Sequence, residues 1–145
     1  MPTARRSRTV AAPPERVWEV VGDPHHLPRW WPKVTRVEAV TDDHFTEVFS
    51  TQDGRLLCAD FRVVDSQAPE RRAWEQELEG NPFERVFSAA STEVKLLPDG
   101  DGTRVTVVVR QQVRGSARLG GFMVRRATGR VLDEALEALE ALHGP

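Results

Sequence analysis

The spacing of apolar residues changes sharply along this chain, and this change most constrains what the chain can fold into. From residue 33 to residue 113, apolar and polar residues alternate, with Val, Thr, Phe and Trp enriched, as in half-buried strands. From residue 119 to residue 143, apolar residues recur every three or four positions, as in one amphipathic helix. The sequence therefore predicts an α+β fold in which a long C-terminal helix covers one face of an antiparallel sheet.

Turn-forming residues divide the alternating segment into strands. Breaks fall at Asp42-Asp43, at Asp53-Gly54, at residues 66–70, at Gly80-Asn81-Pro82 and at residues 98–102. They leave strands at residues 33–40, 45–49, within 55–65, and at 72–78, 83–97 and 103–113. With an earlier strand at residues 7–11, the sheet has seven strands, and a twisted sheet of this size must curl.

Prolines and acidic residues after the first strand predict two short helices. Pro13-Pro14-Glu15 opens the first, because proline is tolerated in a first turn and an acid there complements the helix dipole. Gly22 ends it, and Asp23-Pro24 then opens the second. Pro28 and Pro32 confine that second helix to about two turns.

Two smaller features lie outside the strand pattern. Arg5, Arg6 and Arg8 form a basic cluster, which we expect to be solvated at the start of a strand. Gly129 interrupts the long helix pattern and weakens a helix by about 1 kcal/mol relative to alanine, which indicates close packing at that position.

Length and composition narrow the class of protein. The 145 residues, of which 39% are hydrophobic and 29% charged, predict one globular domain over residues 1–145. A net charge of −2 provides no general attraction for nucleic acid, so we expect no nucleic-acid partner. The single cysteine, Cys58, permits no internal disulfide and no Cys-based metal site. No apolar run approaches the roughly 18 residues of a membrane span, so we expect a cytoplasmic protein without stable membrane insertion.

Alternation along the strands also predicts which side chains face the helix. This inner face is mostly apolar, with Glu47, Gln76 and Gln111 as isolated polar groups that cost about 1 to 3 kcal/mol each if buried without a partner. A ligand with an apolar body and one or two hydrogen-bonding groups suits such a lining. The alternative is that these side chains only pack on the helix. The apolar candidates for ligand contact are Phe45, Phe49, Phe61, Trp74, Phe87, Val107 and Val109.

The order of elements and several local motifs resemble the START-like (SRPBCC) superfamily. The motifs are residues 12–18 (APPERVW), Asp23-Pro24, Trp30, Pro32, residues 69–72 (PERR) and residues 102–106 (GTRVT). Within the superfamily, the chain looks most like the polyketide cyclase/dehydrase and lipid-transport group. This resemblance implies a helix-grip fold, in which the curved sheet wraps around the C-terminal helix and encloses an apolar cavity.

The resemblance also implies that the first turns of the long helix lie near the cavity mouth. Phe122, Met123 and Arg126 occupy these turns, and a guanidinium there could bind a carboxylate, enolate or phenolate. The alternative is a solvated arginine or one paired with a nearby acid. Trp30 and Trp31, held between two prolines, are candidates for a wall or lid, with core packing as the alternative for Trp31.

Motifs for metal and cofactor chemistry are missing from the sequence. His25-His26 and His44 lack metal-ligand spacing, so we expect no metal. No G-x-S-x-G, P-loop or G-x-G-x-x-G motif is present, so we expect neither nucleophilic nor nucleotide-dependent chemistry and no cofactor.

Three hypotheses about function follow. The first is a protein that binds a small hydrophobic molecule, such as a lipid, a quinone or an aromatic polyketide-like compound. The second is a polyketide cyclase or dehydratase acting in the same cavity, with Glu47, Arg126 or a positioned water as the proton-transfer group, since the chain contains no tyrosine. The third is an interaction module in which the helix and a sheet edge form a homodimer or bind another protein.

Overall fold

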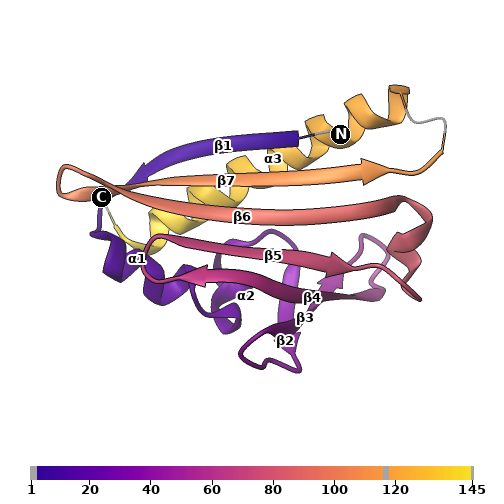
Figure 1. The fold of residues 1–145 in the computed structure, drawn as a ribbon, viewed down its shortest axis with the longest axis horizontal. Helices are drawn as coiled ribbons and strands as arrows, with labels where there is room; N and C mark the ends of the chain where they lie inside the picture. Colours follow the sequence, from indigo (N-terminus) through magenta and orange to yellow (C-terminus); the bar gives the residue numbers. More distant parts are fainter. Residues whose placement is uncertain (1–2, 116–117, 145) are drawn as a thin grey trace.

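The computed structural model describes residues 3–115 and 118–144, apart from the side chains of residues 118–122. Within these residues, seven strands form one antiparallel sheet in the order β1-β7-β6-β5-β4-β3-β2 (Figure 1). The strands are β1 (Thr3–Val10), β2 (Val34–Glu38), β3 (His44–Ser50), β4 (Leu56–Gln67), β5 (Arg71–Glu77), β6 (Phe87–Asp99) and β7 (Gly102–Val113). The predicted seven-stranded antiparallel sheet is confirmed.

The helices lie at one end and on one face of this sheet. α1 (Pro14–Val21), the 3-10 helix η1 (Pro24–His26) and α2 (Leu27–Trp30) connect β1 to β2, which are the two edge strands. The long helix α3 (Arg118–Leu142) runs behind the sheet, and α1 and α2 gather at the end where α3 finishes (Figure 1). The predicted pair of short helices and the long C-terminal helix are therefore also confirmed.

Local sequence explains how the connection between the two edges folds. Pro13 is the N-cap of α1 and Pro14 its first residue, where proline loses no intrahelical hydrogen bond. Asp23 then caps η1, since its carboxylate accepts a 3.0 Å hydrogen bond from the backbone N–H of His25. These two caps begin the short helices that carry the chain across the end of the sheet from β1 to β2.

Irregularities in strand pairing accompany the curvature of the sheet. The register shifts between Val63 and Asp65 on β4, and again between Phe87 and Ala89 on β6. An extra residue in one strand of an antiparallel pair bends that strand and increases its twist. The central strands can therefore curl towards α3.

The first strand differs from its prediction in length and in the surroundings of its arginines. It begins at Thr3, because β7 is long enough to pair with the whole segment. The guanidinium Nε of Arg6 lies 3.2 Å from Asp133 Oδ1 and that of Arg8 lies 3.4 Å from Glu140 Oε2, so both side chains reach α3. Arg6 and Arg8 are thus partly solvated, as expected, but each also pairs with an acid of α3, and each such exposed pair is worth at most about 1 kcal/mol.

The strand predicted for residues 83–97 begins later than expected. Pro82–Arg85 forms the 3-10 helix η2, and β6 starts at Phe87. Asn81 caps η2 by accepting a 3.0 Å hydrogen bond from the backbone N–H of Phe83 on its side-chain oxygen. The Asn-Pro pair thus starts a helical turn where the alternating pattern alone favours a strand.

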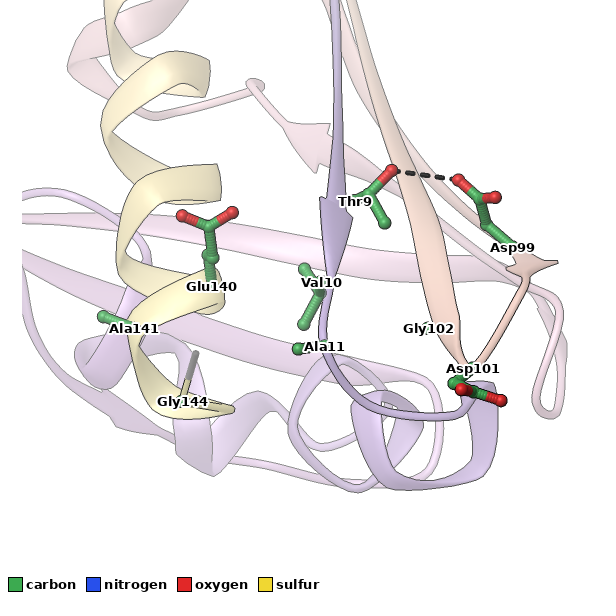
Figure 2. A pocket seen from close by; sticks show the side chains of 9 residues that line it. All are labelled: Thr9, Val10, Ala11, Asp99, Asp101, Gly102, Glu140, Ala141 and Gly144. Atoms are coloured by element: carbon green, nitrogen blue, oxygen red, sulfur yellow. Dashed lines mark hydrogen bonds between the residues drawn. The ribbon is translucent and has the colours of Figure 1, made fainter.

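A hollow lies where β1, the β6–β7 turn and the last turn of α3 meet. Figure 2 shows the Thr9 hydroxyl donating to the Asp99 carboxylate, at 3.0 Å, on one side of it, and Glu140 on the other. A Cβ on Gly102 would lie 2.5 Å from the Val10 carbonyl oxygen, so only glycine lets the two strands approach this closely. The hollow has a volume of about 700 Å³, and none of the described residues that line it is aromatic.

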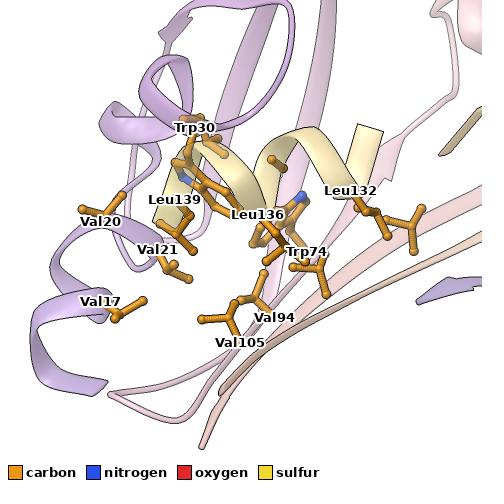
Figure 3. Close-up of a cluster of buried hydrophobic side chains, with 14 of the residues drawn as sticks. Val17, Val20, Val21, Trp30, Trp74, Val94, Val105, Leu132, Leu136 and Leu139 are labelled. Carbon is orange, nitrogen blue, oxygen red and sulfur yellow. The ribbon is translucent and has the colours of Figure 1, made fainter. Parts of the chain in front are cut away.

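The hydrophobic core fills the space between the sheet and the helices. Figure 3 shows side chains of α1, α2 and α3 converging with those of the central strands. Its labelled members are Val17, Val20, Val21, Trp30, Trp74, Val94, Val105, Leu132, Leu136 and Leu139. None of the described helices is both long and apolar enough to cross a membrane.

Candidate ligand-binding cavity

A second hollow, lined largely by apolar side chains, lies between the sheet and the N-terminal half of α3. It has a volume of about 490 Å³, and residues of β3 to β7, of η2 and of α3 line it. Small-molecule sites in proteins are typically concave, mostly apolar clefts of roughly 300 to 1,000 Å³ with a few polar groups. We therefore treat this cavity as the candidate site.

Aromatic rings make up much of the cavity wall. Trp31 and Trp74 meet edge to face with ring centroids 6.4 Å apart, and Phe49 meets Phe83 in the same way at 6.4 Å. Phe61, which also lines the cavity, stacks on a buried phenylalanine, Phe45, at 5.2 Å. These contacts fix the orientation of the rings and so provide a rigid apolar surface.

Glu47 is the one acid among the described residues that line the cavity. It is only 2% exposed, and within the described part of the chain it has no hydrogen-bond or ion-pair partner. Burial raises the pKa of its carboxyl to about 8, because the charged form loses its hydration there. At neutral pH the side chain is thus mainly a neutral carboxylic acid, which can donate one hydrogen bond and accept others.

Gln111 brings a second polar group into the lining, and a neighbour holds it in place. The hydroxyl of Thr128, on α3, donates a 2.9 Å hydrogen bond to Gln111 Oε1, on β7. The amide oxygen is thereby engaged, and the amide nitrogen keeps two donor hydrogens. Gln76 on β5 and Thr92 on β6 add further polar groups, and the polar residues Lys33, Ser50, Thr51 and Gln52 also line the cavity.

The structure brings many of the sequence-predicted site residues to the cavity. Its lining includes Trp31, Glu47, Phe49, Phe61, Trp74, Gln76, Phe87, Val109 and Gln111. Phe45 and Val107 lie in the core instead. Met123 and Arg126 are exposed on α3 and do not belong to the lining, and the side chain of Phe122 lies outside the described residues. That any of them binds a ligand stays a prediction.

The two adjacent tryptophans have different positions. Trp30, which we expected as a wall or lid, is 2% exposed and packs in the core, with its indole Nε1 buried and unpartnered among the described residues. Trp31, for which core packing was the alternative, lines the cavity. Their rings meet edge to face at 5.4 Å, so the core residue supports the cavity residue.

Sequence reasoning missed several lining residues, notably Phe83, Thr128 and Lys33. Thr128 could have been found, because it falls on the apolar stripe of the helix at helical spacing from Val124 and Val131. Lys33 has a positive φ of 67°, an uncommon conformation for a residue with a side chain, and the sequence contains no signal for it.

The histidines lie away from the cavity lining. The His25 ring nitrogen Nδ1 lies 2.8 Å from the carboxylate of Asp23, an exposed pair at the start of η1. In the portion of the chain that the structure describes, no group of three or more His, Cys, Asp or Glu side chains is placed to hold a metal ion.

The fold and its cavity define a helix-grip protein. Comparison with protein families identifies the family more narrowly. Residues 1–144 match the family described as polyketide cyclase / dehydrase and lipid transport, and the chain belongs to this family. The predicted resemblance is thereby confirmed.

Solved structures share the fold at low sequence identity. A START superfamily protein from Mycobacterium smegmatis has a TM-score of 0.80 at 18% identity, over 97% of this chain and 96% of that one. A protein from Thermobifida fusca has a TM-score of 0.77 at 23% identity, over 99% and 94%. The di-domain ARO/CYC StfQ from the steffimycin biosynthetic pathway has a TM-score of 0.76 at 17% identity, over 98% of this chain and 50% of that one. A search of curated proteins finds no match.

Proposed function

We propose that this protein binds a small hydrophobic molecule, such as a lipid, a quinone or an aromatic polyketide-like compound, in the cavity between the sheet and α3. One observation carries the proposal: a cavity of about 490 Å³ has an aromatic wall and a single buried carboxyl that has no partner among the described residues. A ligand gains roughly 25 cal/mol for each Å² of apolar area it buries there. The polar groups of the lining then orient it.

The comparisons support this class of ligand. The description of the family names polyketides and lipid transport, and one structure with the same fold belongs to the steffimycin biosynthetic pathway. Family membership makes an apolar ligand the leading candidate, whereas the choice between a lipid and an aromatic compound depends on the cavity itself.

Native mass spectrometry of the purified protein, followed by solvent extraction, tests the proposal directly. A co-purifying lipid, quinone or aromatic compound would support it. In parallel, the neutral dye N-phenyl-1-naphthylamine would be titrated into the protein, with its fluorescence as the readout. The proposal fails if neither a co-purified molecule nor dye binding is found.

A matched pair of variants locates the binding site. Ala90 lines the cavity, whereas its neighbour Ala89 points to the other face of β6, so Ala90→Leu narrows the cavity and Ala89→Leu does not. We expect Ala90→Leu to weaken dye binding at least tenfold and Ala89→Leu to leave it within about twofold, because only one added side chain displaces the ligand. Equal affinities for the two variants would place the dye elsewhere.

Glu47 supports a second candidate function, a cyclase or dehydratase. General acid–base catalysis is most effective when the pKa of the catalytic group lies near the working pH, and burial brings this carboxyl to about 8. Incubation of the extracted molecule, or of a poly-β-ketone, with the wild type and with Glu47→Gln tests this function by chromatography and mass spectrometry. Conversion by the wild type that is lost in the variant would establish catalysis, and recovery of unchanged ligand would favour a carrier.

Native mass spectrometry of the purified protein also tests the third hypothesis, an interaction module. Large apolar side chains that are exposed on the described surface are Leu56, Val64, Val86, Leu97 and Met123, and they come from different parts of the fold. A defined homodimer without bound ligand in native mass spectrometry would shift the weight to this third hypothesis.

A further inference from the structure

The buried acid of the cavity has no polar partner among the described residues. Glu47, on β3, is buried between the flanking β2 and β4, and its carboxyl has no partner in the described part of the chain. A buried polar group of this kind is normally satisfied by protein, water or ligand. A molecule bound in the cavity can therefore supply the hydrogen-bond partner that the Glu47 carboxyl lacks.

The described cavity lining contains no cation close enough to pair with Glu47. The only other charged residue in the lining is Lys33, which is exposed between α2 and β2. The lining residues of β4, β5, β6, β7, η2 and α3 are all uncharged, and burial alone accounts for the raised pKa of Glu47. The interior thus holds a neutral carboxylic acid, and its O–H group requires a hydrogen-bond acceptor.

Gln111, on β7, also brings an unpaired donor to the cavity. Because the Thr128 hydroxyl donates to its Oε1, the amide orientation is set and its N–H₂ group is left without a partner among the described residues. The indole N–H of Trp74, in the same lining, also has no hydrogen-bond partner among the described residues. Glu47, Gln111 and Trp74 thus each bring to the cavity a donor group for which no described residue provides the acceptor.

We infer that the cavity selects uncharged ligands that carry a carbonyl or similar acceptor oxygen on an apolar ring system, and that it rejects the corresponding carboxylates. This inference rests on the proposed function, since it specifies which hydrophobic molecule the cavity takes. A carbonyl oxygen accepts from the Glu47 acid or the Gln111 amide. A carboxylate beside Glu47 would lose its hydration and would face a group that ionises to an anion itself, while Lys33, the one cation among the described lining residues, is exposed and forms no ion pair with Glu47.

Three matched naphthalene compounds test this selectivity. Methyl 2-naphthoate has a neutral carbonyl, 2-naphthoate has a carboxylate and 2-ethylnaphthalene has no acceptor. Quenching of tryptophan fluorescence at pH 6.5 would give the affinity of each, because Trp31 and Trp74 line the cavity. We expect the ester to bind at least tenfold more tightly than either of the other two compounds.

Variants of Glu47 show whether this residue causes the preference. Glu47→Leu removes the donor and should reduce the advantage of the ester over the hydrocarbon to within about threefold. Glu47→Gln keeps a donor and should retain the preference. At pH 9 the wild type should lose most of the preference, because the carboxyl then ionises, whereas Glu47→Gln should keep it.

The outcomes separate this inference from the proposed function. Binding of all three compounds with similar affinity, tighter binding of the carboxylate, or an unchanged preference in Glu47→Leu would overturn the inference and leave hydrophobic binding intact. If the wild type binds none of the three, the inference fails, and the proposed function is then decided by the mass-spectrometry and dye experiments.

Discussion

Thr128 of α3 donates a 2.9 Å hydrogen bond to the side-chain oxygen of Gln111 on β7. This bond joins the long helix to the sheet at the cavity wall, and it also sets which end of the Gln111 amide is free. A single contact therefore contributes both to helix docking and to the hydrogen-bonding character of the site.

Loss of this bond should affect stability and ligand binding together. In Thr128→Val, Gln111 loses its hydrogen-bond donor, so we expect the free energy of unfolding to fall by about 1 kcal/mol. We also expect affinity for methyl 2-naphthoate to fall severalfold, because the amide is no longer oriented. Urea denaturation and fluorescence titration measure the two effects. Thr128→Ser keeps the hydroxyl and is the control; a Val variant that binds the ester like the Ser variant would contradict the prediction.

The raised pKa of Glu47 makes the stability of the protein depend on pH. The folded protein keeps this proton up to about pH 8, whereas the unfolded chain releases it near 4.5. The stabilisation is complete below pH 4.5 and is lost as pH rises through 8, at up to about 1.4 kcal/mol per pH unit. In Glu47→Gln, where the side chain cannot ionise, the free energy of unfolding should depend less on pH.

Urea denaturation of the wild type and of Glu47→Gln at pH 5, 6, 7 and 8 measures this difference. Glu75→Gln is a control with the same change of charge, because the Glu75 carboxylate is exposed and lies 3.2 Å from a guanidinium nitrogen of Arg62. Parallel profiles for the wild type and Glu47→Gln would show that the carboxyl ionises normally in the folded state.

Gly129 and Arg6 should be energetically coupled. A Cβ on Gly129 would lie 2.5 Å from Arg6 Nη2, so alanine must displace the guanidinium that pairs with Asp133. We expect the helix preference of alanine, about 1 kcal/mol, to be largely offset in Gly129→Ala. In an Arg6→Ala background the same change should stabilise by about the full amount. Thermal unfolding of the four proteins gives the coupling, and strict additivity would refute it.

Thr103 ties the start of β7 to the start of the helical connection. Its hydroxyl donates to the Ala12 carbonyl at 2.7 Å in a buried setting, so Thr103→Val should cost about 1 to 3 kcal/mol. Thr9→Val removes an exposed hydroxyl that donates to Asp99, and we expect a change within about 0.5 kcal/mol. Chemical denaturation of both variants checks the contrast, and equal losses would contradict it.

The fold could be predicted from local signals that agree with one another. Strand alternation predicted both the sheet and its inner face, since residues such as Glu47 and Val109 do line the cavity. Turn residues marked most strand ends. An error arose where a local cap overrode the pattern, as at Asn81, and the pattern did not reveal side chains that reach across the fold, as Arg6 and Arg8 do to α3.

The cavity was harder to predict than the fold, because its position depends on where the sheet and α3 diverge. Periodicity shows that Phe45 and Phe61 face inward, but it cannot show that one lies in the core and the other lines the cavity. Whether Arg126 faces the cavity depends on how α3 is rotated about its own axis. The apolar pattern of the sequence does not fix that rotation to within one residue. The pairing of Thr128 with Gln111 requires the helix and the sheet to be placed together.

The pairing of β1 with β7 has a consequence for how this chain folds. Arg8 pairs with Val105, so the sheet gains its edge strand β1 only when segments from opposite ends of the sequence meet. Contacts this distant slow folding, because loop-closure entropy is lost before the pairing is gained. Arg6 and Arg8 of β1 in turn pair with α3, which forms one wall of the cavity, so that wall is held in place only in the finished fold. A bound molecule therefore stabilises the finished fold alone, by about 1.4 kcal/mol for each tenfold excess over its dissociation constant.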